Sequence, residues 1–293
     1  MQEAGVKILT GRRIKSLSSN ADGTFTLSDG KDSFVHPAVI VCTGGVSYPL
    51  TGSTGDGYGF AERLGIKVTD RIPSLIPIVT AENTSALAGL TLKNVTFSVI
   101  RGGKTVFSEL GEMLFTHSGL SGPLVLSASC HMREALNSYK TEIDLKPAIP
   151  EDELDERLVS ILTENSAKDF INATSRLLPQ KLLPLAAARA GISERIKAGE
   201  VTREMRHRYL HVLKHFEFTP TAFRPIDEAI ITSGGIDVKE IDPRTMEVKA
   251  LPGLYFAGEV LDVDAYTGGY NLQIAFSTGF LAAEAAAERV LGY

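Results

Sequence analysis

The stretch that most constrains the fold lies near the C-terminal end, at residues 253–279, and reads GLYFAGEVLDVDAYTGGYNLQIAFSTG. Its short apolar run before Gly258 is typical of a buried strand, and the run after Gly269 is typical of an apolar helix. The glycines between them predict a strand–turn–helix connection. The unpaired amides at such a helix start suit an anionic or electron-rich ligand atom.

A second strand of the same kind occurs early in the chain, in VCTGGVSYPLTGSTGDGYG at residues 41–59. The preceding apolar residues suit a buried parallel strand. A short helix is expected to follow, with Thr54 or Asp56 as its cap and Gly65 at its end. The loop alone is also compatible with a tight connection that needs glycine for its geometry. Together, two such strand ends favour a nucleotide-type site in an open α/β sheet.

The pattern of apolar and polar residues changes between these two segments. Residues 73–149 alternate like the strands of a small sheet or barrel, residues 150–216 look almost wholly helical, and strand signals return after Pro225. The order predicts an α/β domain that is interrupted by an insertion. We expect the α/β domain at 1–72 and 225–293, a β-barrel insert at 73–149 and 213–224, and a helical insert at 150–212.

Composition excludes several functional classes. The 293 residues carry a net charge of −5, which gives no global reason to expect binding to nucleic acid or to a membrane. The two cysteines, Cys42 and Cys130, cannot form a disulfide framework or a four-cysteine zinc site. Reduced thiols and an N-terminus without the pattern of a signal peptide predict a cytoplasmic protein.

Two further side chains are candidates for chemistry. His117 lies in LFTHSGLSGP at residues 114–123, where a predicted strand runs through a glycine-containing loop into a helix. A histidine there could exchange a proton with a substrate, although a lone histidine is more often a structural hydrogen-bonding group. Glu259 follows the strand at 254–257 and could accept hydrogen bonds from sugar-like hydroxyls.

Together, these motifs resemble the YhiN/BaiN-like flavoproteins, a family described as NAD(P)/FAD-dependent oxidoreductases. The matching segments are VIVCTGG, TGSTGDGY, GEMLFTHSGLSGP and the run from AIITSGGIDV to the C-terminal glycine turn, and they occur in order along nearly the whole chain. The resemblance implies an FAD-binding domain of the glutathione-reductase type, interrupted by a β-barrel and a helical insert. It also implies a flavin-dependent oxidoreductase with NAD(P)H as electron donor and an unknown small-molecule substrate.

The resemblance implies FAD-binding positions for specific residues of this chain. Thr43, Gly44 and Gly45 correspond to the strand end beside the FAD ribose and pyrophosphate, and Ile14 to the position whose backbone meets adenine. Gly258 and Glu259 correspond to the segment before the ribityl chain. The start of the last helix corresponds to the amides that face the flavin pyrimidine edge, and comprises Gly269, Tyr270, Asn271, Leu272 and Gln273. A positive helix end there would stabilise charge on reduced flavin.

The sequence departs from the family in one respect. The family opens with strand–GxGxxG–helix and an acid after the next strand, which hold the ADP moiety, and no GxGxxG occurs in these 293 residues. The chain is therefore expected to be an inactive fragment that binds FAD weakly or not at all. We also expect the surface left by the missing segment to be covered by another chain, which would make a homodimer.

A different class of function is an RNA-binding module. Residues 195–215 carry six Arg or Lys residues against two Glu, on a predicted helix. This helix could contact RNA phosphates, in which case the flavoprotein would act on a base in RNA. His207, His211 and His215 recur at every fourth position of the helix, but such rows without a nearby carboxylate are usually solvated, so no metal site is predicted.

Overall fold

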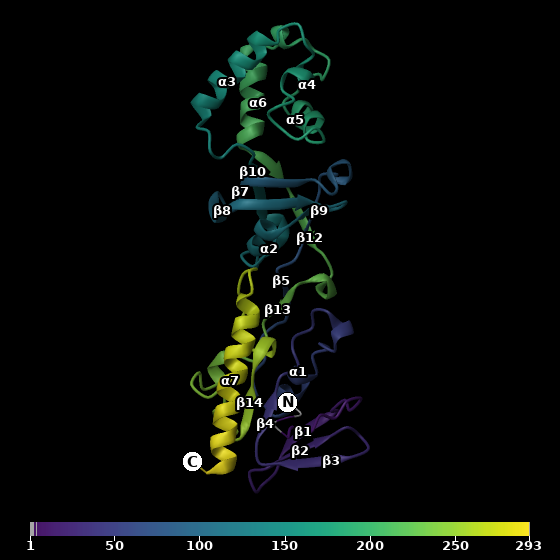
Figure 1. The fold of residues 1–293 in the computed structure, drawn as a ribbon, viewed down its shortest axis with the longest axis vertical. Coiled ribbons are helices and arrows are strands. Elements are labelled where there is room, and N and C mark those ends of the chain that lie inside the picture. The colour runs from purple at the N-terminus through teal and green to yellow at the C-terminus, as the bar shows by residue number, and fades with distance from the viewer. Residues whose placement is uncertain (1–2, 4, 293) are drawn as a thin grey trace. The chain divides into compact units, whose positions relative to one another are not determined.

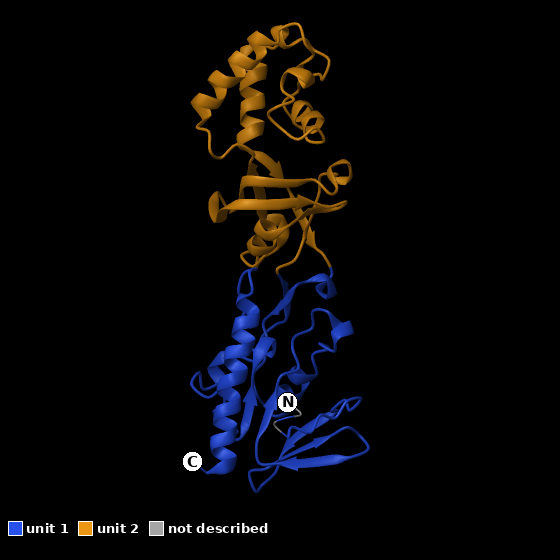
Figure 2. Cartoon of the chain, viewed as in Figure 1, with its two compact units in different colours: residues 1–74, 225–293 blue, residues 75–224 orange. Residues whose placement is uncertain are grey.

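The computed structural model describes residue 3 and residues 5–292. The chain forms two compact units: residues 1–74 with 225–293 form unit 1, and residues 75–224 form unit 2 (Figure 2). The sequence-based division into three domains, with its boundaries at 72, 149, 212 and 224, remains a prediction.

Unit 1 is built on a parallel pair of strands from opposite ends of the chain. β4 (Val39–Val41) lies beside β14 (Leu254–Phe256), with Ile40 opposite Tyr255 (Figure 1). The long helix α7 (Tyr270–Leu291) packs along both strands. All three residues of β14 are buried, as expected for a short apolar strand in a parallel pair. The strand–turn–helix predicted at residues 253–279 is therefore present.

The rest of unit 1 supports this pair. β1 (Ser16–Ser19), β2 (Phe25–Ser28) and β3 (Ser33–His36) form an antiparallel sheet, and α1 (Asp56–Arg63) follows the β4 loop. β5 (Ile72–Ser74) and β13 (Ile231–Ser233) pair where the chain leaves and re-enters the unit. One apolar core joins β1, β2, β4, β14, α1 and α7, and its fully enclosed members include Phe25, Tyr255 and Phe256.

Unit 2 contains a seven-stranded antiparallel sheet in the order β11-β10-β7-β8-β9-β6-β12. Its strands are β6 (Ile78–Thr80), β7 (Thr91–Arg101), β8 (Lys104–Phe115), β9 (Gly119–Ser121), β10 (Tyr139–Asp144), β11 (Phe216–Phe218) and β12 (Pro220–Phe223). The edge strands β11 and β12 are separated only by Thr219, so the sheet must curve strongly. No ladder between the described residues of β11 and β12 closes it, so the predicted barrel is instead an open, curved sheet.

The remaining helices belong to unit 2. α2 (Pro123–Ser129) packs against β8, whereas α3 (Glu151–Glu164), α4 (Phe170–Ala173), α5 (Leu183–Arg189) and α6 (Arg203–Lys214) form a helical group after β10. The start of α3 follows from its sequence, because Pro150 precedes three acidic residues that favour the positive end of a helix. Leu154, Leu158 and Leu162 form its buried stripe, at the spacing of one helix face.

Single-turn 3-10 helices connect several elements: η2 (Pro49–Thr51), η3 (Ser85–Leu87), η4 (Leu136–Ser138), η5 (Ala198–Glu200), η6 (Ile226–Glu228), η7 (Val238–Glu240) and η8 (Gly258–Val260). One local prediction is corrected. The N-cap of α1 is Gly55 in the left-handed region, with no side-chain cap from Thr54 or Asp56, because the side chain of Asp56 is bound to Arg13 instead.

Candidate functional site

The carboxyl ends of β4 and β14 meet at one edge of the parallel pair. Beyond β4 the chain continues through Cys42 and Thr43 into Gly44, which is left-handed at φ +72°. Beyond β14 it enters η8 at Gly258, also left-handed at φ +80°. The amide of Ala257 donates to the carbonyl of Val41 at 3.1 Å, so the two strands remain paired up to these turns. The glycine turns that follow β4 and β14, from the segments at residues 41–59 and 253–279, thus lie side by side.

The carboxylate of Glu259 ties the two turns together. Its Oε1 accepts hydrogen bonds from Ser47 Oγ at 2.9 Å and from the Thr232 amide at 2.8 Å. Thr232 Oγ1 in turn accepts from the amides of Val46 and Ser47 at 2.8 and 3.1 Å. Ser47 and Thr232 are buried. One oxygen of Glu259 is therefore already engaged by the protein, which gives this residue a positioning role in the loop that follows β4.

Gly45 is required by this network. A Cβ on Gly45 would lie 2.3 Å from Thr232 Oγ1 and 2.6 Å from Glu259 Oε1, well inside van der Waals contact. The backbone of Gly45 does not need positive φ, so its requirement is one of space. The groups that approach Gly45 most closely are the protein's own carboxylate and hydroxyl, and its place beside the FAD ribose and pyrophosphate remains a prediction.

The side chain of Thr43, just beyond β4, has a polar atom that makes no hydrogen bond. Its Oγ1 is buried and has no hydrogen-bond partner. A Cβ on Gly57, in the first turn of α1, would lie 2.3 Å from the same oxygen. Buried hydroxyls are normally hydrogen-bonded, and the exceptions are often explained by a group that is not part of the chain. Thr43 Oγ1 is thus a buried polar atom at the end of β4 whose hydrogen-bonding capacity the chain itself does not use.

The start of α7 lies on the β14 side of this edge. Gly268 and Gly269 are both left-handed, and Gly269 provides no side-chain cap for the helix. The Asn271 side chain fixes the preceding turn, because its Oδ1 accepts from the Ala265 amide at 2.9 Å and its Nδ2 donates to the Ala265 carbonyl at 2.8 Å. The first turn of α7 contains no acidic residue. Its positive end is therefore neither capped by a side chain nor neutralised by a nearby acid within the helix.

One contact joins α7 to the β14 turn. The amide of Gly258 donates to Thr278 Oγ1 at 2.9 Å. Thr278 is five residues beyond Gln273 and nine beyond Gly269, so the predicted amides of Gly269–Gln273 lie about 1.4 to 2.5 helical turns from this contact. They belong to the start of α7, which this contact joins to the turn after β14.

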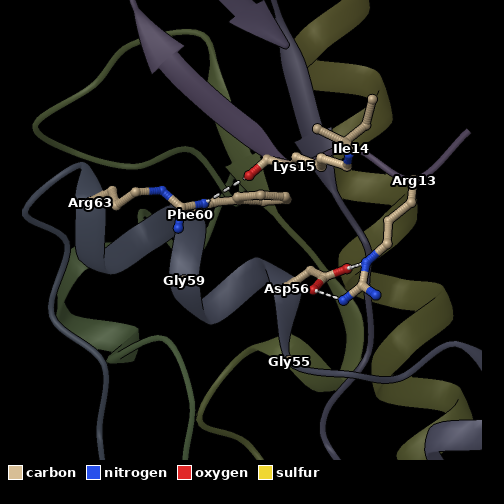
Figure 3. Close-up of a pocket in the computed structure, with 8 residues that line it drawn as sticks. All are labelled: Arg13, Ile14, Lys15, Gly55, Asp56, Gly59, Phe60 and Arg63. Atoms are coloured by element: carbon tan, nitrogen blue, oxygen red, sulfur yellow. Dashed lines mark hydrogen bonds and ion pairs between the residues drawn. The ribbon is translucent and has the colours of Figure 1, made fainter. Parts of the chain in front are cut away.

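Ile14 lines a separate cavity of about 340 Å³ beside α1 (Figure 3). The lining comprises Arg13, Ile14, Lys15, Gly55, Asp56, Gly59, Phe60 and Arg63. One face of α1 lines the cavity, through Asp56, Gly59, Phe60 and Arg63. Gly57 lies on another face of the helix and is next to Thr43. The first turns of α1 therefore lie between the cavity and the β4 loop. The sequence pattern singled out only Ile14, because the other lining residues follow from how the two segments pack.

The cavity is cationic overall, since three basic side chains and a single acid line it. Arg13 binds Asp56 through two hydrogen bonds of 2.6 and 2.9 Å, and this arginine lowers the pKa of the Asp56 carboxyl. The Arg63 guanidinium lies over the Phe60 ring at 5.3 Å and donates to the carbonyl of Lys15 at 3.4 Å (Figure 3). The arrangement combines a flat apolar surface with positive charge.

His117 lies in unit 2, in the loop between β8 and β9, and is exposed. The glycines of this loop serve the sheet: a Cβ on Gly119 would lie 2.1 Å from the Ile78 carbonyl oxygen, and one on Gly122 would lie 2.8 Å from the Leu114 amide. Close backbone packing therefore explains the glycines without a ligand. A role for His117 in catalysis remains a prediction.

The basic helix is α6, and several of its cations are already paired. Arg206 makes a bidentate ion pair with Asp155 at 2.7 and 3.0 Å, which lowers the pKa of that carboxyl. Arg208 binds Glu204 at 2.9 Å, and Lys214 binds Asp144 at 2.6 Å. These acids come from α3, α6 and β10, so the charge excess counted along the sequence is partly neutralised in space.

The histidine row does not form a metal centre. His211 and His215 stack with their ring centroids 4.7 Å apart, and His215 Nδ1 lies 2.9 Å from Glu142 Oε1. His207 Nε2 lies 3.7 Å from Asp155. Across residue 3 and residues 5–292, no group of three or more His, Cys, Asp or Glu side chains could hold a metal ion. A search of the same residues finds no helix long and apolar enough to cross a membrane.

Known proteins match this chain over most of its length. It is 33% identical over 286 residues to a ribosomal RNA dihydrouridine synthase of Haemophilus influenzae, covering 95% of this chain and 68% of the relative. It is 29% identical over 287 residues to a 3-dehydro-bile acid delta(4,6)-reductase of Clostridium scindens, covering 97% and 70%. A ribosomal RNA dihydrouridine synthase of Escherichia coli is 30% identical over 277 residues, covering 93% and 66%.

The model of one protein family, the HI0933-like protein Rossmann domain, matches residues 1–285. That span includes both strands of the parallel pair, the glycine turns beyond them and most of α7. The mixed α/β architecture of unit 1 agrees with a Rossmann-type domain. The chain therefore belongs to the HI0933-like Rossmann-domain family, as its resemblance to the YhiN/BaiN-like flavoproteins predicted.

Proposed function

We propose that this chain acts as a flavin-dependent oxidoreductase that uses FAD as redox cofactor and NAD(P)H as electron donor. The observation that carries the proposal is the meeting of two glycine turns at the carboxyl ends of parallel strands, next to a helix whose positive end is left open. Open α/β sheets bind nucleotide cofactors at this position.

The residues present fit such a cofactor. The amides at the start of α7 can donate to the electron-rich edge of a flavin, because no side chain caps them. Thr43 offers a buried hydroxyl without a partner at the end of β4. The cavity beside Ile14 combines an aromatic ring with three cations, which suits a planar base carrying phosphate.

When bound, FAD supplies the hydride-transfer chemistry that amino-acid side chains lack. The part of this chain is to orient the cofactor and tune its environment. The positive end of α7 would stabilise negative charge at the flavin edge. Glu259 would hold the β4 loop in place through Ser47 and Thr232, acting on the cofactor only through that loop. His117 is the candidate proton donor to the substrate.

The relatives favour a particular reaction class. The names dihydrouridine synthase and delta(4,6)-reductase both describe the addition of hydrogen across carbon–carbon double bonds. We infer that the substrate of this protein is likewise an unsaturated compound, and that the reaction adds a hydride to one carbon of a double bond and a proton to the other. The first candidate substrate class is a small molecule.

RNA is the second candidate, and two relatives named as ribosomal RNA dihydrouridine synthases favour it. We expect any contribution of α6 to come mainly from Arg203, since Arg206 and Arg208 are held by Asp155 and Glu204. Charge reversal at Arg203, Arg206 and Arg208 should weaken binding to a ribosomal RNA fragment if α6 contacts phosphates. If binding at low salt is unchanged, α6 does not contact the RNA phosphates.

The flavin proposal is tested by equilibrium dialysis of the purified chain against FAD. We expect the chain to be colourless as purified and to bind FAD saturably but weakly. No GxGxxG turn occurs in the 293 residues, and each charge-assisted hydrogen bond to phosphate that a site does not make lowers the binding free energy by about 1.5–3 kcal/mol, or roughly one to two orders of magnitude in affinity. Tight, stoichiometric flavin in the chain as purified would contradict the weak-binding part of this proposal.

A matched pair of variants locates the site. Gln273→Glu places an acid in the first turn of α7, where it favours the helix itself but opposes an electron-rich ligand atom. Ser277→Asp places the same charge farther along the helix, on another exposed position. We expect Gln273→Glu to weaken FAD binding about tenfold, or about 1.4 kcal/mol, and Ser277→Asp to change it little. Equal effects, or no saturable binding to the unmodified chain, would refute the assignment of α7.

A further inference from the structure

A cavity of about 300 Å³ lies in the helical group of unit 2. It is formed by the last turn of α3, the turn that follows it, α4 and the turn after α4 (Figure 1). Its polar lining comprises Glu164, Asn165, Lys168, Asn172, Ser175 and Arg176. We call it the α3–α4 cavity. Its volume is at the lower end of the range for small-molecule sites, so it suits a ligand smaller than a dinucleotide.

The wall of the α3–α4 cavity is held by a segment that does not line it. The amide of Phe170 donates to the carbonyl of Ile196 at 2.8 Å. The amide of Ala198 donates to the carbonyl of Lys168 at 2.9 Å. The turn that carries Lys168 is therefore fixed by the protein itself, and the cavity is formed before any ligand arrives, as is usual for small-molecule sites.

Two cations of this cavity are not paired within the protein. Across residue 3 and residues 5–292, the Lys168 ammonium and the Arg176 guanidinium make no hydrogen bond or ion pair. The acid next to Lys168 in sequence is Asp169, and its carboxylate is bound to Lys197 at 2.7 Å. Both cations that line the cavity thus keep their charge and their donors available for an anion.

The other polar groups of the cavity suit a ligand with more than an anionic group. Asn165 Nδ2 donates to the Ile161 carbonyl at 2.8 Å, and Glu164 Oε1 accepts from Ser160 Oγ at 2.7 Å. Within the described part of the chain, Asn165 Oδ1, Glu164 Oε2 and the Asn172 side-chain amide have no partner. A carboxylate opposes a simple inorganic anion, but it accepts hydrogen bonds from the hydroxyl and amino groups of a larger ligand.

The combination of these groups matches the parts of a nucleotide. Arginine binds phosphate through two parallel hydrogen bonds, and lysine binds it as a point charge. Asparagine side chains pair with the edges of bases, and the plane of a guanidinium can stack on a base. Ile161 and Leu177 are half-buried in the lining and add an apolar surface for the base.

We propose that the α3–α4 cavity binds one ribonucleotide unit. Lys168 and Arg176 hold its phosphate, whereas Asn165, Asn172 and Glu164 contact its base and ribose. The unit is a free nucleoside monophosphate or one nucleotide of a single-stranded RNA, because both present the same groups. The RNA source rests on the second candidate substrate of the proposed function, and the free nucleotide does not. Neither source requires FAD.

The test is calorimetric titration of the full chain, without FAD, with the four ribonucleoside monophosphates, inorganic phosphate and a single-stranded oligoribonucleotide. Arg176→Ala and Arg195→Ala are a matched pair, since both arginines are exposed in unit 2 and only Arg176 lines the cavity. We expect Arg176→Ala to weaken nucleotide binding at least about tenfold, because charge-assisted hydrogen bonds are lost. Arg195→Ala should change it little. Asn172→Ala should weaken nucleotide binding and leave phosphate binding unchanged.

Acetylation of lysines, read by mass spectrometry, locates the ligand. A bound nucleotide should slow the acetylation of Lys168. Lys15 is the internal reference, because it lines the cavity beside Ile14, which is a separate candidate for a base that carries phosphate. Arg176→Ala should bind FAD as the unmodified chain does, so a failure of the flavin proposal is distinguishable from a failure here.

The relative affinities identify the source of the nucleotide. An oligoribonucleotide that binds more tightly than any monophosphate, and that Arg176→Ala weakens, assigns the cavity to RNA, since further phosphates then contribute. An oligoribonucleotide that binds no more tightly assigns it to a free nucleotide.

Four results would overturn the proposal. They are no saturable binding of any nucleotide, equal effects of Arg176→Ala and Arg195→Ala, protection of Lys15 in place of Lys168, and inorganic phosphate that binds as tightly as the monophosphates. The last result would leave a simple anion site. Circular dichroism of each variant confirms that the chain remains folded, as expected for exposed side chains.

Discussion

Replacing Glu259 tests how the candidate site is held together. In Glu259→Ala, the Thr232 amide and the Ser47 hydroxyl each lose an acceptor, at 2.8 and 2.9 Å in the structure. Both residues are buried: Thr232 is 1% exposed and Ser47 is 3% exposed. Hydrogen bonds to a charged group contribute about 1.5–3 kcal/mol each, and unsatisfied buried donors add to the loss.

We expect Glu259→Ala to lower the free energy of local opening around residues 45–47 and 231–233 by about 2–4 kcal/mol. Glu259→Gln keeps an acceptor oxygen at the same position, so it should cost about 1 kcal/mol or less. Because 1.4 kcal/mol is a factor of ten, the alanine variant should accelerate amide exchange at Val46, Ser47 and Thr232 by roughly 30- to 1,000-fold.

Hydrogen exchange measured by mass spectrometry at neutral pH is the assay, with the helix α3 in unit 2 as the internal reference. The glutamine variant serves as the control for loss of charge without loss of the acceptor. If the alanine and glutamine variants exchange at the same rate, the acceptor role is wrong. If neither differs from the unmodified chain, Glu259 does not hold the β4 loop, and its carboxylate is free for a ligand.

Three further predictions follow from single features of the structure. Gly45→Ala should destabilise unit 1 by about 1–3 kcal/mol and lower its melting temperature, since the new methyl would lie 2.3 Å from Thr232 Oγ1 and 2.6 Å from Glu259 Oε1. Because Arg13 lowers the pKa of Asp56, this carboxyl stabilises the fold fully above its usual pKa and loses that contribution as the pH falls, so Asp56→Asn should make stability in urea depend less on pH between about 5 and 3. His117→Ala should lower the rate of NAD(P)H-dependent substrate reduction by about 100-fold or more if His117 donates the proton, and a loss of less than threefold would leave it without that role.

Local sequence determined the elements that carry their own signals. The acids after Pro150 set the start of α3, and the apolar run after Gly269 gave α7. The short apolar runs at β4 and β14 were recognisable as buried strands before either partner was known. The motifs also determined the family, because their order along the chain is specific. For the helices and strands, the information lies within about twenty residues, where helix dipoles, periodicity and turn chemistry act.

Tertiary structure decided what depends on residues far apart in the chain. Ser47 and Glu259 meet across 212 positions, so no local pattern could show that the acid holds the β4 loop. The sheet of unit 2 remains open because β11 and β12 do not pair, whereas alternation alone predicts strands and not closure. The apolar pattern of α7 reads as one helix that packs on a sheet. Only the packing reveals which of its sides β14 and β4 cover, because burial is set by neighbours and not by the helix itself.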